Sequence, residues 1–166
     1  MVWFRVFVVC CLFPGFTFAS LQFGTGANSA TGGRLVPSLN LGLGTDRIMF
    51  LASSTGVATE SYYHSNYTLS MYWKRNAGEI GWGPVTTGFG VGSLYAKRGF
   101  QDSATTEIEK SDWVLGPAFY SQWNFLGGFY LSVEGIYGII GPSSRNFDLA
   151  GLNARDHVNF ILGFSL

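Results

Sequence analysis

The residues of this sequence that could do chemistry are few, and the first of them is an acid within an apolar stretch. Glu134 lies in segment 128–139 among aromatic, aliphatic and small residues. A carboxylate enclosed by apolar structure must find hydrogen-bond donors, a cation or a proton. We expect an interior polar site in which Glu134 meets Tyr120, Tyr130, Gln122 or a reaching Lys or Arg. A gate or a proton-linked switch is the sharper alternative for the same site.

Two histidines are the other candidates. His64 and His157, with Glu60 or Asp156, could bind a metal, but their spacing matches no metal-ligand motif. The glycines at 88, 90 and 92 superficially suggest a nucleotide-binding loop, yet no helix or downstream acid supports that interpretation. We therefore predict no catalytic residues, no metal site and no cofactor.

The first nineteen residues predict a secretory signal peptide. One charge, Arg5, precedes an apolar run over 6–13, and Thr17-Phe18-Ala19 forms a small-x-small cleavage site. Pro14 and Gly15 break the run, which is shorter than a transmembrane helix. Residues 20–166 then form one domain. Both cysteines, Cys10 and Cys11, fall in the leader, so the domain has neither a disulfide nor a thiolate site.

The composition narrows the classes of partner. The chain has ten Lys and Arg, of which Arg5 lies in the leader, against ten Asp and Glu. A near-neutral domain argues against a nucleic-acid partner. Aromatic residues and glycine are abundant and charge is scarce, but no apolar run after Ala19 could span a membrane as a helix. If the protein crosses a membrane, it does so with strands.

Eight segments are rich in β-branched and aromatic residues and are bounded by turn-forming residues, which predicts eight strands. They cover residues 21–27, 33–43, 47–57, 62–74, 82–96, 113–125, 128–139 and 156–166. Several alternate with period two, although 48–51 is apolar on both faces. Trp82 breaks the alternation of its strand unless Gly83-Pro84 forms a bulge. The glycine stripe at 88, 90 and 92 is expected to make room inside for Tyr72, Tyr120 and Tyr130.

The links between these segments differ in length. Those at 44–46, 75–81 and 126–127 are short, and between them lie 28–32, 58–61, 97–112 and 140–155, of which the last two are long. Outer-membrane barrels alternate short periplasmic turns with longer outer loops. Of the charges, only Glu134 lies deep within a predicted strand.

Aromatic residues on the outward faces form two rows. One row lies near the ends expected in the periplasm (Trp73, Trp123, Phe129 and Phe164), and the other near the outer ends (Tyr63, Tyr95, Trp113 and Tyr137). Two such girdles are typical of membrane barrels. The final residues also alternate, with Phe160, Leu162, Phe164 and Leu166 on one face. A last strand of this kind pairs with the first strand when a barrel closes.

The chain resembles the small eight-stranded outer-membrane barrels, the superfamily of OmpX-like, OmpA-transmembrane-like and opacity-like proteins. The segments that carry the resemblance are V-N-F-I-L-G-F-S-L, G-P-A-F-Y-S-Q-W-N-F and G-G-F-Y-L-S-V-E-G-I-Y-G. It implies an all-β, antiparallel up-and-down transmembrane barrel, a monomer in the bacterial outer membrane. It also implies that barrel-assembly machinery reads residues 160, 162, 164 and 166. The family usually ends in Phe or Trp, so Leu166 is expected to be read less efficiently.

The resemblance favours a non-enzymatic role, in envelope structure or in surface interaction through the outer links at 99–112 and 141–155. Lys97, Arg98, Arg145 and Arg155 are candidate contacts to lipopolysaccharide phosphates. A narrow pore for ions or small solutes is the alternative. A lipid A-modifying enzyme is a further alternative, but such enzymes carry His-x-Ser, and the tripeptides here are His-Ser-Asn at 64–66 and His-Val-Asn at 157–159.

Overall fold

The alternating segments all become strands. The computed structural model describes residues 20–31, 34–59, 62–103, 106–141 and 156–166. These residues form β1 (Ser20–Thr31), β2 (Arg34–Gly44), β3 (Ile48–Thr59), β4 (Tyr62–Ile80), β5 (Gly83–Ser103), β6 (Thr106–Asn124), the short 3-10 turn η1 (Leu126–Gly128), β7 (Phe129–Tyr137) and β8 (Asp156–Ser165). Within these ranges no helix has the length and apolarity needed to span a membrane.

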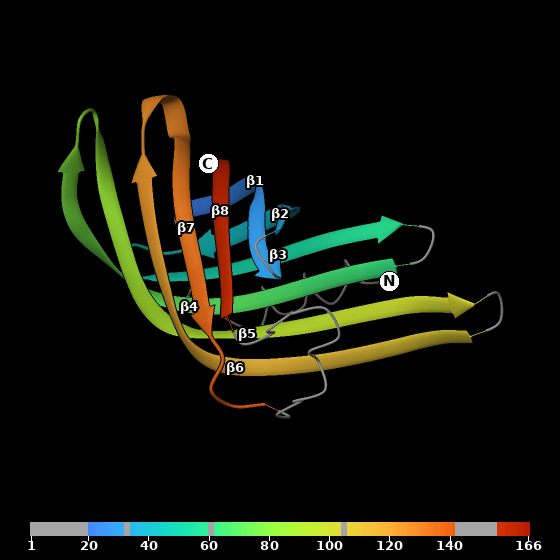
Figure 1. Cartoon of the computed structure of the whole chain (residues 1–166). Helices are drawn as coiled ribbons and strands as arrows, with labels where there is room; N and C mark the ends of the chain where they lie inside the picture. The colour runs from blue at the N-terminus through green and yellow to red at the C-terminus, as the bar shows by residue number, and fades with distance from the viewer. Residues whose placement is uncertain (1–19, 32–33, 60–61, 104–105, 142–155) are drawn as a thin grey trace, which may run out of the picture.

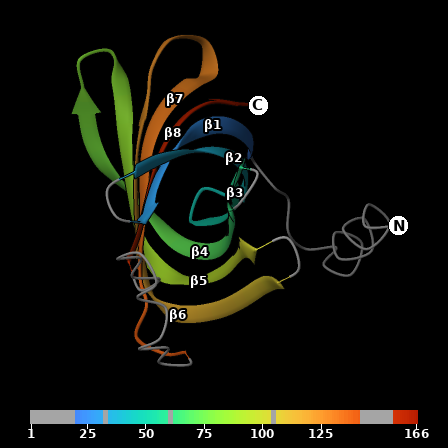
Figure 2. The ribbon, with the colours of Figure 1, turned by 45° about the vertical axis from the view of Figure 1, so that its right-hand side comes forward.

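The eight strands close into one barrel. Each strand pairs antiparallel with the next, and β8 pairs with β1. Figures 1 and 2 show the strands wrapping around a common axis. At the junction Leu21 and Leu166 exchange backbone hydrogen bonds of 3.2 and 2.9 Å. Closure leaves no sheet edge along this seam, and the predicted eight-stranded antiparallel up-and-down barrel is confirmed.

The barrel has two rims. The terminal rim carries Ser20, Leu166 and the turns that join β2 to β3, β4 to β5 and β6 to β7 (Figure 1). The distal rim carries the far ends of β1–β2, β3–β4 and β5–β6. Register partners climb from the first rim towards the second along the row Gly44, Met49, Tyr72, Gly90, Ala118, Ile136 and His157. This stagger is the shear that closing a barrel requires.

Alternation sorts the side chains between the two faces of the wall. Asn66, Thr68, Ser70 and Tyr72 of β4 are buried inside, whereas Tyr67, Leu69 and Trp73 are exposed outside. In β3, where the sequence was ambiguous, Met49 and Leu51 are buried and Phe50 lies outside.

The prediction of a long link over 97–112 was wrong, because most of this segment is strand. β5 continues to Ser103 and β6 begins at Thr106, with paired rungs from Tyr95↔Trp113 out to Ser103↔Thr106. In this segment the alternation of apolar and polar residues is lost although the backbone pairing continues. The sequence pattern therefore predicted a loop where the structure has a hairpin. β5 and β6 project as a long pair in Figure 1.

The prediction for the link between β4 and β5 was also wrong. β4 reaches Ile80, so most of the predicted 75–81 link is strand. Trp82 lies in the turn between the strands, so it does not have to follow the inward–outward alternation of β5. The irregularity in the β4–β5 pairing falls between Asn76 and Gly78 rather than at Gly83-Pro84. Gly78 and Gly81 have φ values of 117° and 60°, which glycine adopts without a side-chain penalty.

Candidate functional site

The barrel interior holds most of the polar side chains that the structure describes as buried. They are Gln22, Ser38, Asn40, Ser53, Thr55, His64, Asn66, Thr68, Ser70, Gln122, Ser132, Glu134, His157 and Asn159. They come from every strand except β5. Among the described side chains, Glu134 is the only acid in this set, and no Lys or Arg belongs to it.

Glu134 is completely buried and is bound by two hydroxyl donors from β4. Ser70 Oγ donates to its Oε1 at 2.7 Å, and Tyr72 OH donates to the same oxygen at 2.6 Å. Hydrogen bonds to an ionised acceptor are stronger than neutral ones. The structure therefore ties β7 to β4 through one carboxylate oxygen.

The other expected members of the site lie close by but bind differently. Tyr120, Tyr130 and Gln122 are all buried inside the barrel. Gln122 donates its amide to Asn124 Oδ1, and the Tyr120 ring stacks on Tyr72 at a centroid distance of 5.3 Å. The sequence placed Ser70 and Tyr72 on the inward face, but a contact across more than sixty residues leaves no periodic signal.

A second polar network joins β2 to β8. Ser38 Oγ donates to Asn159 Oδ1 at 2.9 Å, and Asn159 Nδ2 donates to Asn40 Oδ1 at 2.7 Å. Asn40 Nδ2 in turn donates to Ser38 Oγ at 3.1 Å, which closes the ring. Asn159 is also the register partner of Glu134 on β8. Sequence reasoning named none of these three as a site residue.

The rest of the interior is filled by apolar and aromatic side chains. The buried cluster comprises Met49, Leu51, Tyr72, Ala118, Tyr120, Tyr130, Ile136 and Ile161. Of the glycine stripe, Gly88 lies against Tyr72, since a side-chain carbon there would be 3.1 Å from Cβ of Tyr72, whereas one at Gly92 would meet Ile136 and Ser70. Tyr130 is instead accommodated by Gly24 and Gly163, on β1 and β8, which is a correction to the expected role of the stripe.

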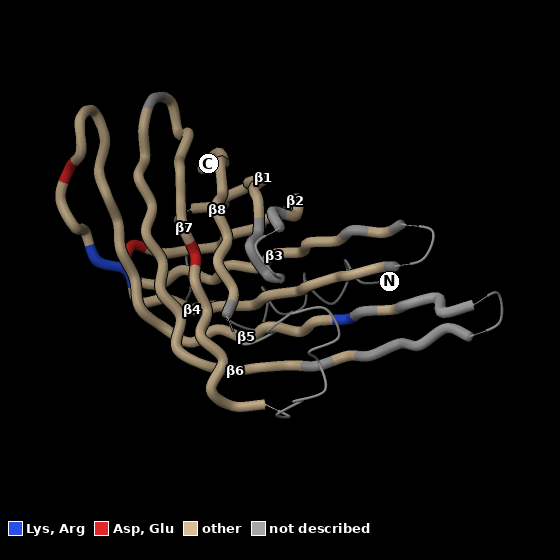
Figure 3. The backbone as a smooth tube through the Cα atoms, viewed as in Figure 1, with Lys and Arg blue, Asp and Glu red and all other residues tan. Residues whose placement is uncertain are grey.

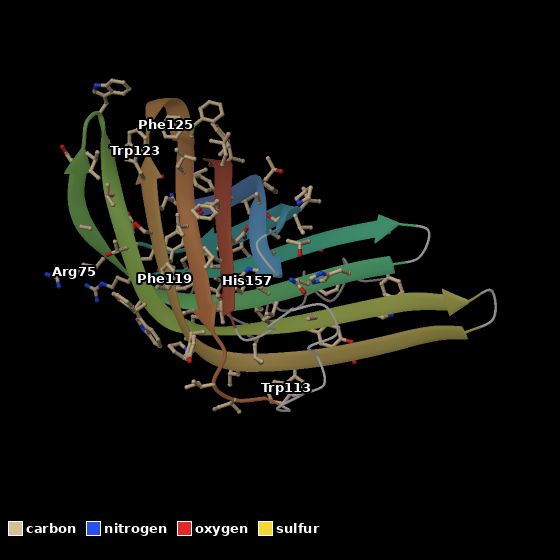
Figure 4. All side chains as sticks on the ribbon, viewed as in Figure 1. Arg75, Trp113, Phe119, Trp123, Phe125 and His157 are labelled. Atoms are coloured by element: carbon tan, nitrogen blue, oxygen red, sulfur yellow. The ribbon has the colours of Figure 1, made fainter. Side chains whose placement is uncertain are left out.

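Both histidines are buried inside the barrel towards its distal half. His64 Nε2 lies 2.7 Å from Asn66 Oδ1, and His157 pairs with Ile136 in the register (Figure 4). Among the described residues, no three His, Cys, Asp or Glu side chains gather as a metal site would require.

Charge is sparse on the described barrel wall, as Figure 3 shows. Lys97 Nζ lies over the Tyr63 ring, 5.8 Å from its centroid, near the distal rim. Arg98 is the register partner of Lys110 on β6. Arg145, Arg155, the leader over 1–19 and the link over 142–155 lie outside the described residues.

The outer surface of the barrel carries the two aromatic rows. Near the terminal rim, Trp123, Phe125, Phe129 and Phe164 form a continuous chain of ring contacts with centroid distances of 5.2, 6.3 and 5.3 Å. Tyr95 and Trp113 face each other as register partners towards the distal rim. Figure 4 shows Trp123 near the terminal-rim end of β6 and Trp113 part-way along the same strand.

The alternating residues of the final strand also face outward. Phe160, Leu162 and Leu166 are exposed, as is part of Phe164, while Ile161 points inside. The described wall thus presents large apolar side chains outward on every strand, including Leu39, Leu69, Phe89, Phe119 and Leu131. Such a surface is unsuited to water and suited to lipid.

Comparison with known proteins adds likeness of fold. No protein-family model matches the chain, and no curated protein matches it. The N-terminal β-barrel domain of Pseudomonas aeruginosa OprF is similar at a TM-score of 0.55 and 12% identity, over 89% of this chain and 97% of that one.

Two further solved barrels are similar. Neisserial surface protein A has a TM-score of 0.51 and 11% identity, over 89% of this chain and 94% of that chain. Ail, the attachment invasion locus protein of Yersinia pestis, solved with the heparin analogue sucrose octasulfate, has a TM-score of 0.51 and 13% identity, over 89% and 96%. At these identities the likeness establishes the small eight-stranded barrel fold.

Proposed function

We propose that the protein is a monomeric barrel of the bacterial outer membrane with a non-enzymatic role in surface interaction. The location is supported by an apolar outer wall bounded by two aromatic rows. A membrane barrel has this band and these girdles. The terminal rim then faces the periplasm and the distal rim faces outward, after removal of the leader over 1–19.

The observation that carries the surface role is the β5–β6 hairpin. Its rungs continue from Tyr95↔Trp113, at the outer aromatic row, to Ser103↔Thr106. At the rise of an extended strand, this hairpin projects about 25 Å beyond the row. A paired ladder is a firmer platform than an unstructured loop, and binding residues commonly lie on segments that a rigid scaffold positions.

Its sequence suggests two zones. Lys97, Arg98 and Lys110 lie on two neighbouring rungs just beyond the aromatic row and Asp112, whereas Glu109 follows on the next rung and Glu107 lies farther out. Bases at the membrane surface suit the phosphates of lipopolysaccharide. Arg145 and Arg155 are proposed to add to this contact, and residues 141–155 to the partner surface. The exposed side chains of Phe160, Leu162, Phe164 and Leu166 are proposed to be read by the barrel-assembly machinery.

Two alternatives have less support. The buried cluster that includes Met49, Tyr72, Tyr120 and Tyr130 fills the interior and argues against an open pore. A lipid A enzyme needs a histidine–serine pair at the outer lipid face, whereas His64 and His157 are buried inside. The non-enzymatic role therefore remains the proposal that the geometry supports best.

The experiment uses bacteria that display either the full barrel or a variant with residues 97–111 replaced by Asn-Gly, which removes the three bases and joins the register partners Ala96 and Asp112. Retention on heparin-coated plates is the first readout, because Ail was solved with a heparin analogue and the hairpin base carries Lys97, Arg98 and Lys110. We expect the shortened variant to fall to the level of cells with an empty vector. The Trp82→Ala variant, changed at the opposite rim, is the matched control and should bind normally. Equal retention by all three proteins would contradict the hairpin's role.

A further inference from the structure

Within the described part of the chain, five buried side-chain atoms inside the barrel have no hydrogen-bond partner. They are Tyr120 OH, Gln122 Oε1, Tyr130 OH, Ser132 Oγ and Glu134 Oε2. All five are oxygens, and all five belong to β6 or β7. Leaving a buried polar atom unpartnered costs free energy, so such atoms are uncommon in native interiors. A group of five on two adjacent strands indicates that something else satisfies them.

The register places four of these residues in one patch. Tyr120 is directly opposite Glu134 across β6–β7, and Gln122 is opposite Ser132. Tyr130, two residues before Ser132, also points inward, but its hydroxyl lies against Gly24 and Gly163 of β1 and β8. Directly opposed residues on one face of an antiparallel pair have Cβ atoms about 5 Å apart. The other four residues therefore occupy neighbouring positions on the inner face of β6 and β7.

Among the residues that the structure describes, none brings a positive charge to this patch. Glu134 meets only uncharged groups, because its Oε1 accepts from Ser70 and Tyr72 and its register partner is Asn159. Lys74 is on the same face of β4 as Tyr72, but it is only half-buried and its charged neighbour is Asp46. Burying a carboxylate without a compensating charge is costly.

We propose that this patch, the β6–β7 oxygen site, binds one alkali metal cation of the size of sodium. A single carboxylate supplies the one negative charge that a monovalent ion neutralises. Hydroxyl, amide and carboxylate oxygens are ligands suited to hard cations, whereas the site offers no imidazole or thiolate for a transition metal. The interior of an eight-stranded barrel leaves room for a small ion rather than an organic ligand.

The ion would satisfy two needs at once. It offsets the Glu134 charge, and it gives Oγ of Ser132 and Oε1 of Gln122 a partner. Because Glu134 also accepts from Ser70 and Tyr72, the ion would couple β6 and β7 to β4. Its binding would therefore stabilise the folded barrel in proportion to its concentration. This inference is independent of the role proposed for the β5–β6 hairpin.

The test is the thermal unfolding midpoint of the folded full-length barrel in a neutral detergent, read from its gel mobility. Total ionic strength is fixed with chloride salts, and choline is replaced stepwise by sodium, potassium or lithium. We expect the midpoint to rise with sodium and saturate, by at least about 4 °C, which suits a domain of this size. Choline, too large for the interior, gives the baseline.

Three variants make the result specific. Glu134→Gln keeps the shape but removes the charge, and its midpoint should be the same in choline and sodium. Glu79→Gln changes an exposed acid at the β4–β5 hairpin and should respond as the wild type does. Ser132→Ala removes one oxygen of the site, so the sodium concentration at half-saturation should increase several-fold.

A second readout, sodium-23 NMR, uses the wild-type barrel alone and so does not depend on whether a variant folds. The sodium-23 resonance should broaden on addition of wild-type barrel and narrow again when lithium or potassium in excess displaces the ion. A wild-type midpoint that is identical in choline and sodium, with an unbroadened sodium signal, would overturn the proposal and leave a site filled by water or a proton. An equal sodium response in Glu134→Gln would also overturn it.

Discussion

Tyr72 of β4 donates its hydroxyl hydrogen to Oε1 of Glu134 of β7 at 2.6 Å, and both side chains are completely buried. Two strands, β5 and β6, separate them around the wall, so the bond crosses the interior instead of following the sheet. This hydrogen bond therefore links β4 and β7 directly across the barrel interior.

Removing this hydroxyl should destabilise the barrel. Tyr72→Phe leaves Oε1 with Ser70 alone, and a hydrogen bond to a charged group contributes about 1.5–3 kcal/mol. We expect the free energy of unfolding in urea, measured from lipid vesicles, to decrease by that amount. Tyr95→Phe, on the exposed outer face, is the control and should change it by less than about 0.5 kcal/mol. Equal losses in the two variants would show that the Glu134 bond is unimportant.

Gly92 should resist substitution because of what lies against it. A side-chain carbon there would be 2.8 Å from both Cγ1 of Ile136 and Oγ of Ser70. Gly92→Ala should therefore cost about 1–3 kcal/mol, as overpacking of a filled core does. Gly56→Ala meets nothing closer than 3.7 Å and should be neutral in the same urea titration. If both variants are neutral, the interior is looser than the structure indicates.

The filled interior predicts an absence of conduction. Planar bilayers containing the wild-type barrel should show no discrete current steps, because the rings of Tyr120 and Tyr130 occupy the lumen. Replacing both by alanine creates a cavity, and the double variant, if heat-modifiable on gels, should show small steps. Steps of the same size in the wild type would instead favour the pore, with Glu134→Gln expected to alter their ion selectivity.

The non-enzymatic role predicts unchanged lipid A. Mass spectra of lipid A from outer membranes with and without the expressed protein should coincide, because His64 and His157 are buried away from the lipid. A discrete change in acyl mass would contradict this and direct attention to those two histidines.

The barrel itself was predictable because a membrane imposes strong patterns. Outward apolar positions, rim charges and the alternating final strand all follow from lipid on one face and a narrow lumen on the other. The hairpin of residues 97–112 was predicted as a link because no such contrast exists beyond the aromatic row, where both faces meet water. There the backbone ladder continues without a hydrophobic period to reveal it.

The interior site was predictable only in part. Period two placed Glu134, Tyr120, Tyr130 and Gln122 on inward faces, but it does not say which residues meet across the lumen. Which residues meet depends on the shear of the barrel, because the stagger between paired strands brings Ser70 of β4, rather than a residue of β6, to the Glu134 carboxylate. Shear is fixed by all eight registers together, which no single segment encodes.

The central claim is that the two rims lie on opposite sides of an outer membrane, with the β5–β6 hairpin outside. Single cysteines test it directly, because the only native cysteines are Cys10 and Cys11 in the predicted leader. Intact cells carrying Ser103→Cys or Trp82→Cys are treated with a membrane-impermeant maleimide, and permeabilised cells give the total. We expect labelling of Ser103→Cys in intact cells and of Trp82→Cys only after permeabilisation. The reverse pattern, or labelling of neither site in intact cells, would contradict it.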